Sequence, residues 1–205
     1  MKNLSVLLFA LLVSIVAKAQ DSSSLALNLY GGYTFSDKVE YDPAYGYVED
    51  GFQYGLGLEY FLAPTHSIEL KYLRMDTDMP LYGPAGTQLN AGDDKGAINL
   101  ILLGGTVYFG SSEQTALPYF GGGLGVGIVE TPQSGNGTHF AWDIKTGVKI
   151  QTGSVVSINL NAYLQSITAA VGDSYYYTYY GIVELTDYVA TYQFGLGVVL
   201  SFNFE

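Results

Sequence analysis

The feature that most constrains this chain is a strict alternation of apolar and small or polar residues near its end, over residues 188–204. Every even position from Tyr192 to Leu200 is aromatic or aliphatic, and the odd positions between them include Gln193, Gly195 and Gly197. A period of two places successive side chains on opposite faces of a β-strand and does not match the 3.6-residue period of a helix. The segment therefore predicts a long strand with one apolar face.

Seven earlier segments carry strand signals and are separated by turn residues. They lie at 25–35, 52–61, 67–75, 96–110, 118–130, 139–150 and 155–167. Alternation is clear at 52–61 and 139–150, whereas both faces of 96–110 are largely apolar. The 26 Gly and 19 Tyr agree with β structure and close backbone contacts. The sequence thus predicts one all-β domain of eight strands over residues 20–205.

The first nineteen residues are expected to be a cleaved signal peptide. Lys2 precedes an apolar run from Leu4 to Ala17, and Ala17-Lys18-Ala19 is a small-x-small cleavage site, so Gln20 would begin the mature chain. The apolar run is shorter than the roughly 20 residues of a spanning helix, which argues against an N-terminal anchor. The absence of Cys excludes a lipoprotein-type attachment, disulfides and thiolate metal sites.

The charge excludes one class of partner. Loss of Lys2 and Lys18 with the signal peptide would lower the formal net charge from −11 by two, to −13. Nucleic-acid phosphates need a basic patch, so no nucleic-acid partner is expected.

Two kinds of barrel fit eight alternating strands: a soluble one with the apolar face inward, as in lipocalins, and a membrane one with that face outward. Aromatic residues near the ends of the apolar faces and glycines at 121, 123, 125 and 127 on a polar face favour the membrane barrel. Short links at 62–66, 111–117 and 151–154 alternate with long ones at 36–51, 76–95 and 168–187, and an intermediate one at 131–138. An even strand number puts both termini on the short-turn side. The predicted fold is an eight-stranded antiparallel transmembrane β-barrel with short periplasmic turns and long extracellular loops.

These features resemble the small eight-stranded outer-membrane β-barrels, such as the OmpA transmembrane domain, OmpX and OmpW. The most specific match is the closing strand, YQFGLGVVLSFNF, although Glu205 follows Phe204 and departs from that pattern. In that group the barrel-assembly machinery reads a terminal aromatic strand. The resemblance therefore implies this machinery as a partner during insertion, and outer-membrane lipids and lipopolysaccharide as surroundings. The Ala-Gln cleavage junction resembles signal peptides of Bacteroidetes.

The inward face of such a barrel would carry charges. We expect them to form an ion-pair network that plugs and stiffens the barrel, because side chains fill the interior of eight strands. A narrow charged conduit for small solutes is the alternative. The candidate lumen residues are Glu59, Glu69, Lys71, Asp143, Lys145 and Lys149.

No catalytic motif accompanies the two histidines. His66 lies in a predicted turn, and His139 lies near the outer rim with Asp143 about one layer deeper. The chain has no phosphate-binding loop, no GxSxG and no HExxH, and the glycines of GGGLGVG alternate along a strand. We therefore expect no enzyme, no cofactor and no metal site, and an envelope enzyme built on His139 is the least favoured alternative.

The long links are acidic. Their carboxylates predict a solvated surface, with weak binding of Ca²⁺ or Mg²⁺ as the alternative. These residues are Asp37, Glu40, Asp42, Glu49, Asp50, Asp76, Asp78, Asp93, Asp94, Asp173, Glu184 and Asp187.

The last long link also contains the run DSYYYTYYG, residues 173–181. We predict a tyrosine-rich hairpin outside the membrane, with a sticky surface patch as the alternative, because Tyr offers large contact area at small entropic cost. Its tyrosines are Tyr175, Tyr176, Tyr177, Tyr179 and Tyr180. The expected role of the protein is structural or in surface interaction, with any extracellular ligand left open.

Overall fold

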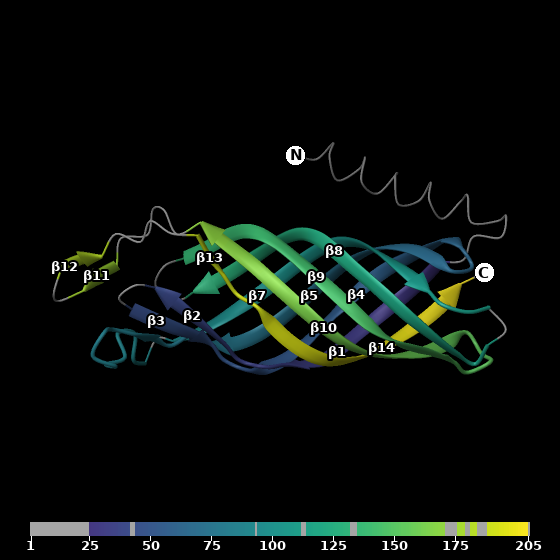
Figure 1. The fold of residues 1–205 in the computed structure, drawn as a ribbon, viewed down its shortest axis with the longest axis horizontal. Helices are drawn as coiled ribbons and strands as arrows, with labels where there is room; N and C mark the ends of the chain where they lie inside the picture. Colours follow the sequence, from purple (N-terminus) through teal and green to yellow (C-terminus); the bar gives the residue numbers. More distant parts are fainter. Residues whose placement is uncertain are drawn as a thin grey trace.

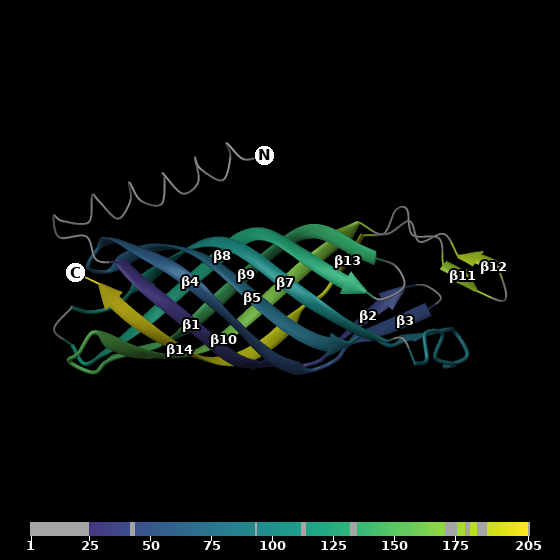
Figure 2. The same ribbon diagram turned by 180° about the vertical axis from the view of Figure 1, so that it is seen from behind.

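Eight long strands form the wall of a closed antiparallel barrel in the computed structural model (Figures 1 and 2). The structure describes residues 25–41, 44–92, 94–111, 114–131, 135–170, 176–178, 181–183 and 188–204. Each wall strand pairs with the next, and β1 pairs with β14 to close the sheet. The wall consists of β1 (Leu25–Thr34), β4 (Gly51–Ala63), β5 (His66–Asp78), β7 (Lys95–Tyr108), β8 (Ala116–Thr131), β9 (Gly135–Gln151), β10 (Val156–Ala170) and β14 (Gln193–Phe204). The predicted fold class is confirmed.

The two ends of the barrel differ, as the link lengths predicted. Short links at 64–65, 109–115 and 152–155 lie at the end where β1 begins and the chain terminates, which we call the short-link end. The opposite, long-link end carries a sheet of β2 (Asp37–Tyr41), β3 (Ala44–Val48) and β6 (Leu81–Tyr82). The long-link segment before β14 also contains a hairpin of β11 (Tyr176–Thr178) and β12 (Gly181–Val183), followed by β13 (Tyr188–Ala190), which pairs with β10.

Two strand boundaries differ from the sequence prediction. The intermediate link at 131–138 is mostly strand, because the β8–β9 ladder continues to the pair Thr131 and Gly135. Residues 188–204 are interrupted between β13 and β14, where the backbone N–H of Tyr192 donates to Asp37 Oδ2 at 2.7 Å. Register with β10 is unchanged across the interruption, so the alternation of faces continues through it.

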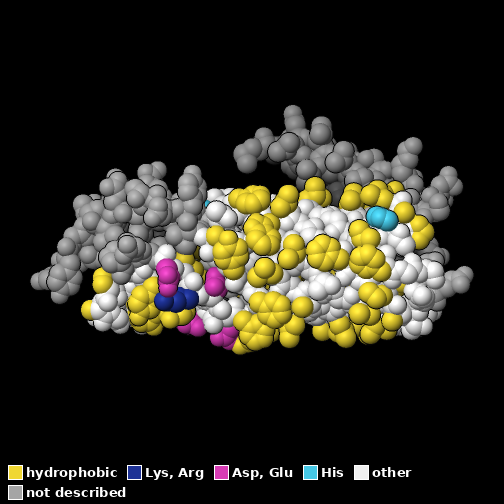
Figure 3. Space-filling view, in the orientation of Figure 1, with side chains coloured by type: hydrophobic (Ala, Val, Ile, Leu, Met, Phe, Trp, Pro, Cys, Tyr) yellow, Lys and Arg dark blue, Asp and Glu magenta, His cyan; other side chains and the backbone are white. Residues whose placement is uncertain are grey.

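The barrel is apolar outside and largely polar inside. Leu103 and Leu124 on the outer wall are each 62% exposed, whereas Gln193 on the inner wall is 1% exposed. Figure 3 shows hydrophobic side chains covering the wall, with charged ones gathered toward the long-link end. This is the membrane arrangement that the sequence favoured over a soluble barrel. No helix among the described residues is long and apolar enough to cross a membrane.

Part of the upper lumen, toward the long-link end, is apolar instead. Strand β7 is apolar on both faces because Leu100 and Leu102 point inward while Ile101 and Leu103 point outward. Two valines from the β2–β3 hairpin pack against this inner cluster, so the hairpin covers the apolar part of the lumen. The cluster consists of Val39, Val48, Leu73, Met75, Ile98, Leu100, Leu102, Ala141 and Ile167.

Candidate functional site: the charged lumen

All six charged residues expected in the lumen have side chains on the inner wall. Glu59 comes from β4, Glu69 and Lys71 from β5, and the others from β9. The backbone alternation of each strand places them inward, and all six are largely withdrawn from solvent. Three carboxylates thus face three ammonium groups. The six are Glu59, Glu69, Lys71, Asp143, Lys145 and Lys149.

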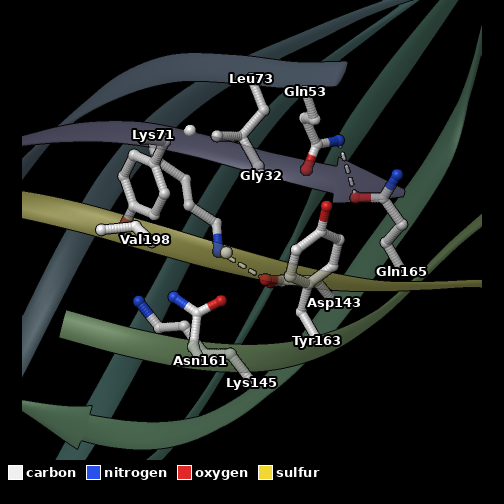
Figure 4. A pocket seen from close by; sticks show the side chains of 13 residues that line it. Gly32, Gln53, Lys71, Leu73, Asp143, Lys145, Asn161, Tyr163, Gln165 and Val198 are labelled. Carbon is white, nitrogen blue, oxygen red and sulfur yellow. Dashed lines mark hydrogen bonds and ion pairs between the residues drawn. The ribbon is translucent and has the colours of Figure 1, made fainter. Parts of the chain in front are cut away.

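Two ion pairs cross the lumen between β5 and β9. Lys71 Nζ lies 2.5 Å from Asp143 Oδ2, a pair visible in Figure 4. Lys145 Nζ lies 2.8 Å from Glu69 Oε2. Strands β7 and β8 separate β5 from β9 along the wall, so both pairs join strands that share no backbone ladder. Side chains alone tie these strands together.

The glutamates are further held by neutral donors. Asn28 Nδ2 on β1 donates to Glu69 Oε1 at 2.6 Å and to Glu59 Oε2 at 3.0 Å. Glu59 Oε1 accepts from Ser67 Oγ at 2.5 Å and from Tyr108 OH at 2.7 Å. Because a buried carboxylate needs several donors to offset lost hydration, this set explains how two glutamates fit in one layer.

Lys149 is held differently. Its Nζ lies 4.7 Å from the ring centre of Phe61 and 5.2 Å from that of Tyr108, near the short-link end. Such contacts are cation–π interactions. Among the described residues no carboxylate lies within 4.0 Å of this ammonium group.

Neutral residues that the sequence reasoning did not select form a second polar layer. Gln53 Nε2 donates to Gln165 Oε1 at 2.9 Å, and Gln165 Nε2 donates to Gln193 Oε1 at 3.3 Å. Tyr163 OH and Thr34 Oγ1 lie 2.7 Å apart. The alternating pattern does put Gln53 and Gln193 on polar faces. Gln193 is the direct cross-strand partner of Gln165, whereas the contact between Gln53 and Gln165 depends on closure of the barrel.

The inward glycines make room for the charged side chains. A Cβ at Gly123 would lie 2.9 Å from Asp143 Oδ1, and one at Gly121 would lie 3.2 Å from Lys145 Cε. Both separations are shorter than ordinary contacts. The inward glycines of β8 therefore leave the space that the charged side chains occupy.

A small cavity lies among these residues. Its volume is about 30 Å³, and Asp143 Oδ1 beside it is buried without a hydrogen-bond partner among the described residues. A space of this size and polarity suits one or two water molecules. Figure 4 shows the side chains around it, among them Lys71, Asp143, Lys145, Asn161, Tyr163 and Gln165.

The histidines take no part in this network. His66 is exposed in the β4–β5 turn, with Nδ1 2.9 Å from Thr65 Oγ1. His139 is half-buried on β9, and the carboxylate of Asp143, which the sequence placed one layer below it, pairs with Lys71. In the part of the chain that the structure describes, no three His, Asp or Glu residues are grouped as metal ligands would be.

The tyrosine run is described only in part. The backbones of Tyr176 and Tyr177 pair with Val183 and Ile182 in the β11–β12 hairpin. Tyr175, Tyr179 and Tyr180 lie outside the described residues, as do Asp42, Asp93, Asp173, Glu184 and Asp187 of the acidic links. The surface patch, the cation binding and the signal peptide stay predictions.

Comparison with known proteins relates the chain to others by structure. No family model matches it, and no curated protein does. The crystal structure of Neisserial surface protein A superposes with a TM-score of 0.52 at 14% identity, over 87% of this chain and 96% of that one. The crystal structure of outer membrane protein OprG from Pseudomonas aeruginosa superposes with a TM-score of 0.53 at 14% identity, over 88% of this chain and 96% of that one. The outer membrane protease OmpT from Escherichia coli gives 0.49 at 8% identity, over 90% and 97%, a likeness too weak to bear on activity. The chain has the fold of the small outer-membrane β-barrels.

Proposed function

We propose that this protein is an outer-membrane barrel with a structural or surface-interaction role, and that polar side chains close its lumen. The observation that carries the proposal is the pair of ion pairs, Lys71–Asp143 and Lys145–Glu69, that cross between opposite walls. Buried charges arranged in this way resist separation, because moving either partner leaves an unpaired charge in a poorly solvated space.

The charge balance supports a static network. Three carboxylates and three ammonium groups leave the lumen without formal excess charge, so no ion is favoured by net attraction. The cavity beside Asp143, of about 30 Å³, is too small for a solute larger than water.

The proposed location is the outer membrane, reached through the signal peptide 1–19 and insertion by the barrel-assembly machinery. The apolar outer wall and the unequal ends support this location. In this orientation the long-link end is extracellular, and its β2–β3–β6 sheet and acidic links meet lipopolysaccharide and external partners. We assign the protein no enzymatic role.

Single-channel recording in planar bilayers tests the proposal. The refolded protein is expected to give no conductance steps above the bare bilayer. The variant Lys71→Ala/Lys145→Ala opens the layer between β5 and β9 and is the positive control for insertion. Regular conductance steps from the unmodified protein would overturn the closed lumen.

A narrow conduit for small solutes is the second candidate. Asp143 Oδ1, which has no hydrogen-bond partner in the described part of the chain, lies beside the small cavity and favours it, because water there could extend along the polar layers. Liposome swelling with small sugars and amino acids separates the two candidates, since only an open conduit admits them.

A further inference from the structure

A polar cluster interrupts the apolar outer wall near the long-link end. Its residues occupy outward positions on three neighbouring strands, β5, β7 and β8. A charged side chain on a membrane-facing wall costs least near the bilayer surface, where lipid headgroups lie. The cluster consists of Tyr72, Arg74, Asp76, Asn99 and Glu130.

Neighbours hold the guanidinium of Arg74 in place. Its Nη2 donates to Asp76 Oδ1 at 2.8 Å, and its Nη1 donates to Asn99 Oδ1 at 3.0 Å. Nη1 also lies 3.3 Å from Glu130 Oε1, which accepts from Asn99 Nδ2 at 2.8 Å. With Nε also donating to Asp76, one of the five guanidinium N–H groups has no acceptor among the described residues.

A hollow adjoins this guanidinium. It has a volume of about 320 Å³, far more than the roughly 10–15 Å³ that one water molecule needs on the same measure. Ala97, which is itself buried, pairs in register with both Asp76 and Glu130, so a small residue lies between two long ones among the residues that line the hollow. The lining residues are Arg74, Lys95, Gly96, Ala97, Glu130 and Thr131.

Two of the three cations that lie outside both the lumen and the predicted signal peptide line this hollow. Of the eight Lys and Arg in the chain, two lie in the predicted signal peptide and three in the lumen. The remaining three are Lys38, Arg74 and Lys95, and two of these line the hollow. The exposed Lys95 has no carboxylate within 4.0 Å among the described residues. Counting partners only among the described residues, the two cations of the hollow offer one unused guanidinium N–H and one unpaired ammonium group.

We propose that this hollow binds the phosphate of an outer-leaflet lipid of the lipid A class. Arg74 and Lys95 donate to the phosphate oxygens, because charged donors form the strongest hydrogen bonds to phosphate. Asp76 and Glu130 orient Arg74 but repel a free phosphate ion. The acyl chains of a lipid offset this repulsion by packing on the apolar wall below, where Ile101 and Leu103 are exposed. The inference rests on the proposed outer-membrane location.

Native mass spectrometry tests the site. Protein refolded in detergent micelles is mixed with equal amounts of bisphosphorylated lipid A and its dephosphorylated form, and retained lipid is counted. The unmodified protein is expected to retain the bisphosphorylated lipid preferentially. In Arg74→Gln/Lys95→Gln this preference falls at least about tenfold, the effect of losing charged hydrogen bonds.

Lys38→Gln is the matched control for Lys95→Gln, since each removes one external lysine and only Lys95 lines the hollow. Lys95→Gln leaves the Arg74 contacts intact, so it reports on binding even where changes at Arg74 impair folding. A heat-dependent shift on SDS gels verifies each folded variant.

Equal retention by the unmodified protein and both Lys95 variants would overturn the proposal. If excess inorganic phosphate alone displaced lipid A, the hollow would be a site for free phosphate and not for a lipid phosphate. Conduction through the lumen would contradict the proposed function. It would not change the lipid-binding result, because binding is measured in micelles.

Discussion

At the scale of single residues, charges inside the barrel are tolerated because each one contacts a specific partner side chain. Lys71 and Asp143 are both nearly inaccessible to solvent and lie 2.5 Å apart. Removing one partner of a buried ion pair lowers the free energy of unfolding more than replacing both partners with apolar residues, since the single substitution leaves an uncompensated charge. This asymmetry gives a direct test of the network.

Lys71→Met is expected to lower the free energy of unfolding by about 3–5 kcal/mol, because Asp143 is left buried without its cation. The double variant Lys71→Met/Asp143→Leu should recover most of that loss, since no lone charge remains. Urea unfolding in lipid vesicles, followed by tryptophan fluorescence, measures both. A double variant as unstable as the single one would contradict the cross-lumen pair.

Tyr163 gives a second residue-scale prediction. Its ring lies over the cross-strand partner Gly195, where a Cβ would come within 2.3 Å of Tyr163 Cζ. Gly195→Ala should therefore cost about 1–3 kcal/mol of unfolding free energy by overpacking, and less in a Tyr163→Leu background.

Gly105→Ala is the control for that substitution. A Cβ there would lie 3.4 Å from Ser67 O, an ordinary contact, so stability should be unchanged or slightly raised. If both alanine variants unfold at the same urea concentration, the ring of Tyr163 does not constrain Gly195.

At the scale of elements, the β2–β3 hairpin packs against the barrel and is not a solvated loop. Thr77 Oγ1 donates to Glu49 O at 2.7 Å, and Val39 and Val48 are buried in the upper lumen. The sequence placed this segment in a long acidic link, because its charged residues dominate the pattern. Its burial depends on the inward faces of β5 and β7, which are distant in sequence.

Val39→Ser/Val48→Ser should lower the free energy of unfolding by about 3–6 kcal/mol, taking roughly 1.5–3 kcal/mol for each buried valine. Conductance should stay at the level of the bare bilayer, because the ion pairs between β5 and β9 are untouched. Unfolding and planar-bilayer recordings of the same preparation measure the two effects. Conductance steps in this variant would show that the hairpin closes the barrel.

At the scale of the whole molecule, closure removes every free edge from the main sheet. Ten residue pairs join β1 to β14, so no strand of the wall is left with unpaired backbone groups along a membrane-facing edge. A structure held by one continuous ladder should unfold as a unit.

The folded protein is accordingly expected to migrate differently on SDS gels before and after boiling, because SDS alone does not open the ladder. Extraction from cells should require detergent. Recovery of the protein in a detergent-free periplasmic fraction would contradict the membrane barrel, and a variant lacking residues 193–204 should lose the shift.

The sequence by itself determined the number of strands in the barrel wall, the faces of most of them and the difference between the two ends. These follow from local properties: a period of two in hydrophobicity, and the lengths of the links between strands. The same alternation selected the six charged lumen residues, because it assigns each side chain to a face whatever its partner.

The tertiary structure alone decided which of those residues meet. Lys71 reaches Asp143 and Lys145 reaches Glu69 because closure brings β5 opposite β9, and 72 or more positions separate the partners in sequence. Closure likewise brought Gln53 to Gln165, whereas the pairing of β5 with β7 set Arg74 and Lys95 beside one hollow on the outer wall. Alternation specifies the face of a strand, whereas contact across a lumen depends on the register of every strand between.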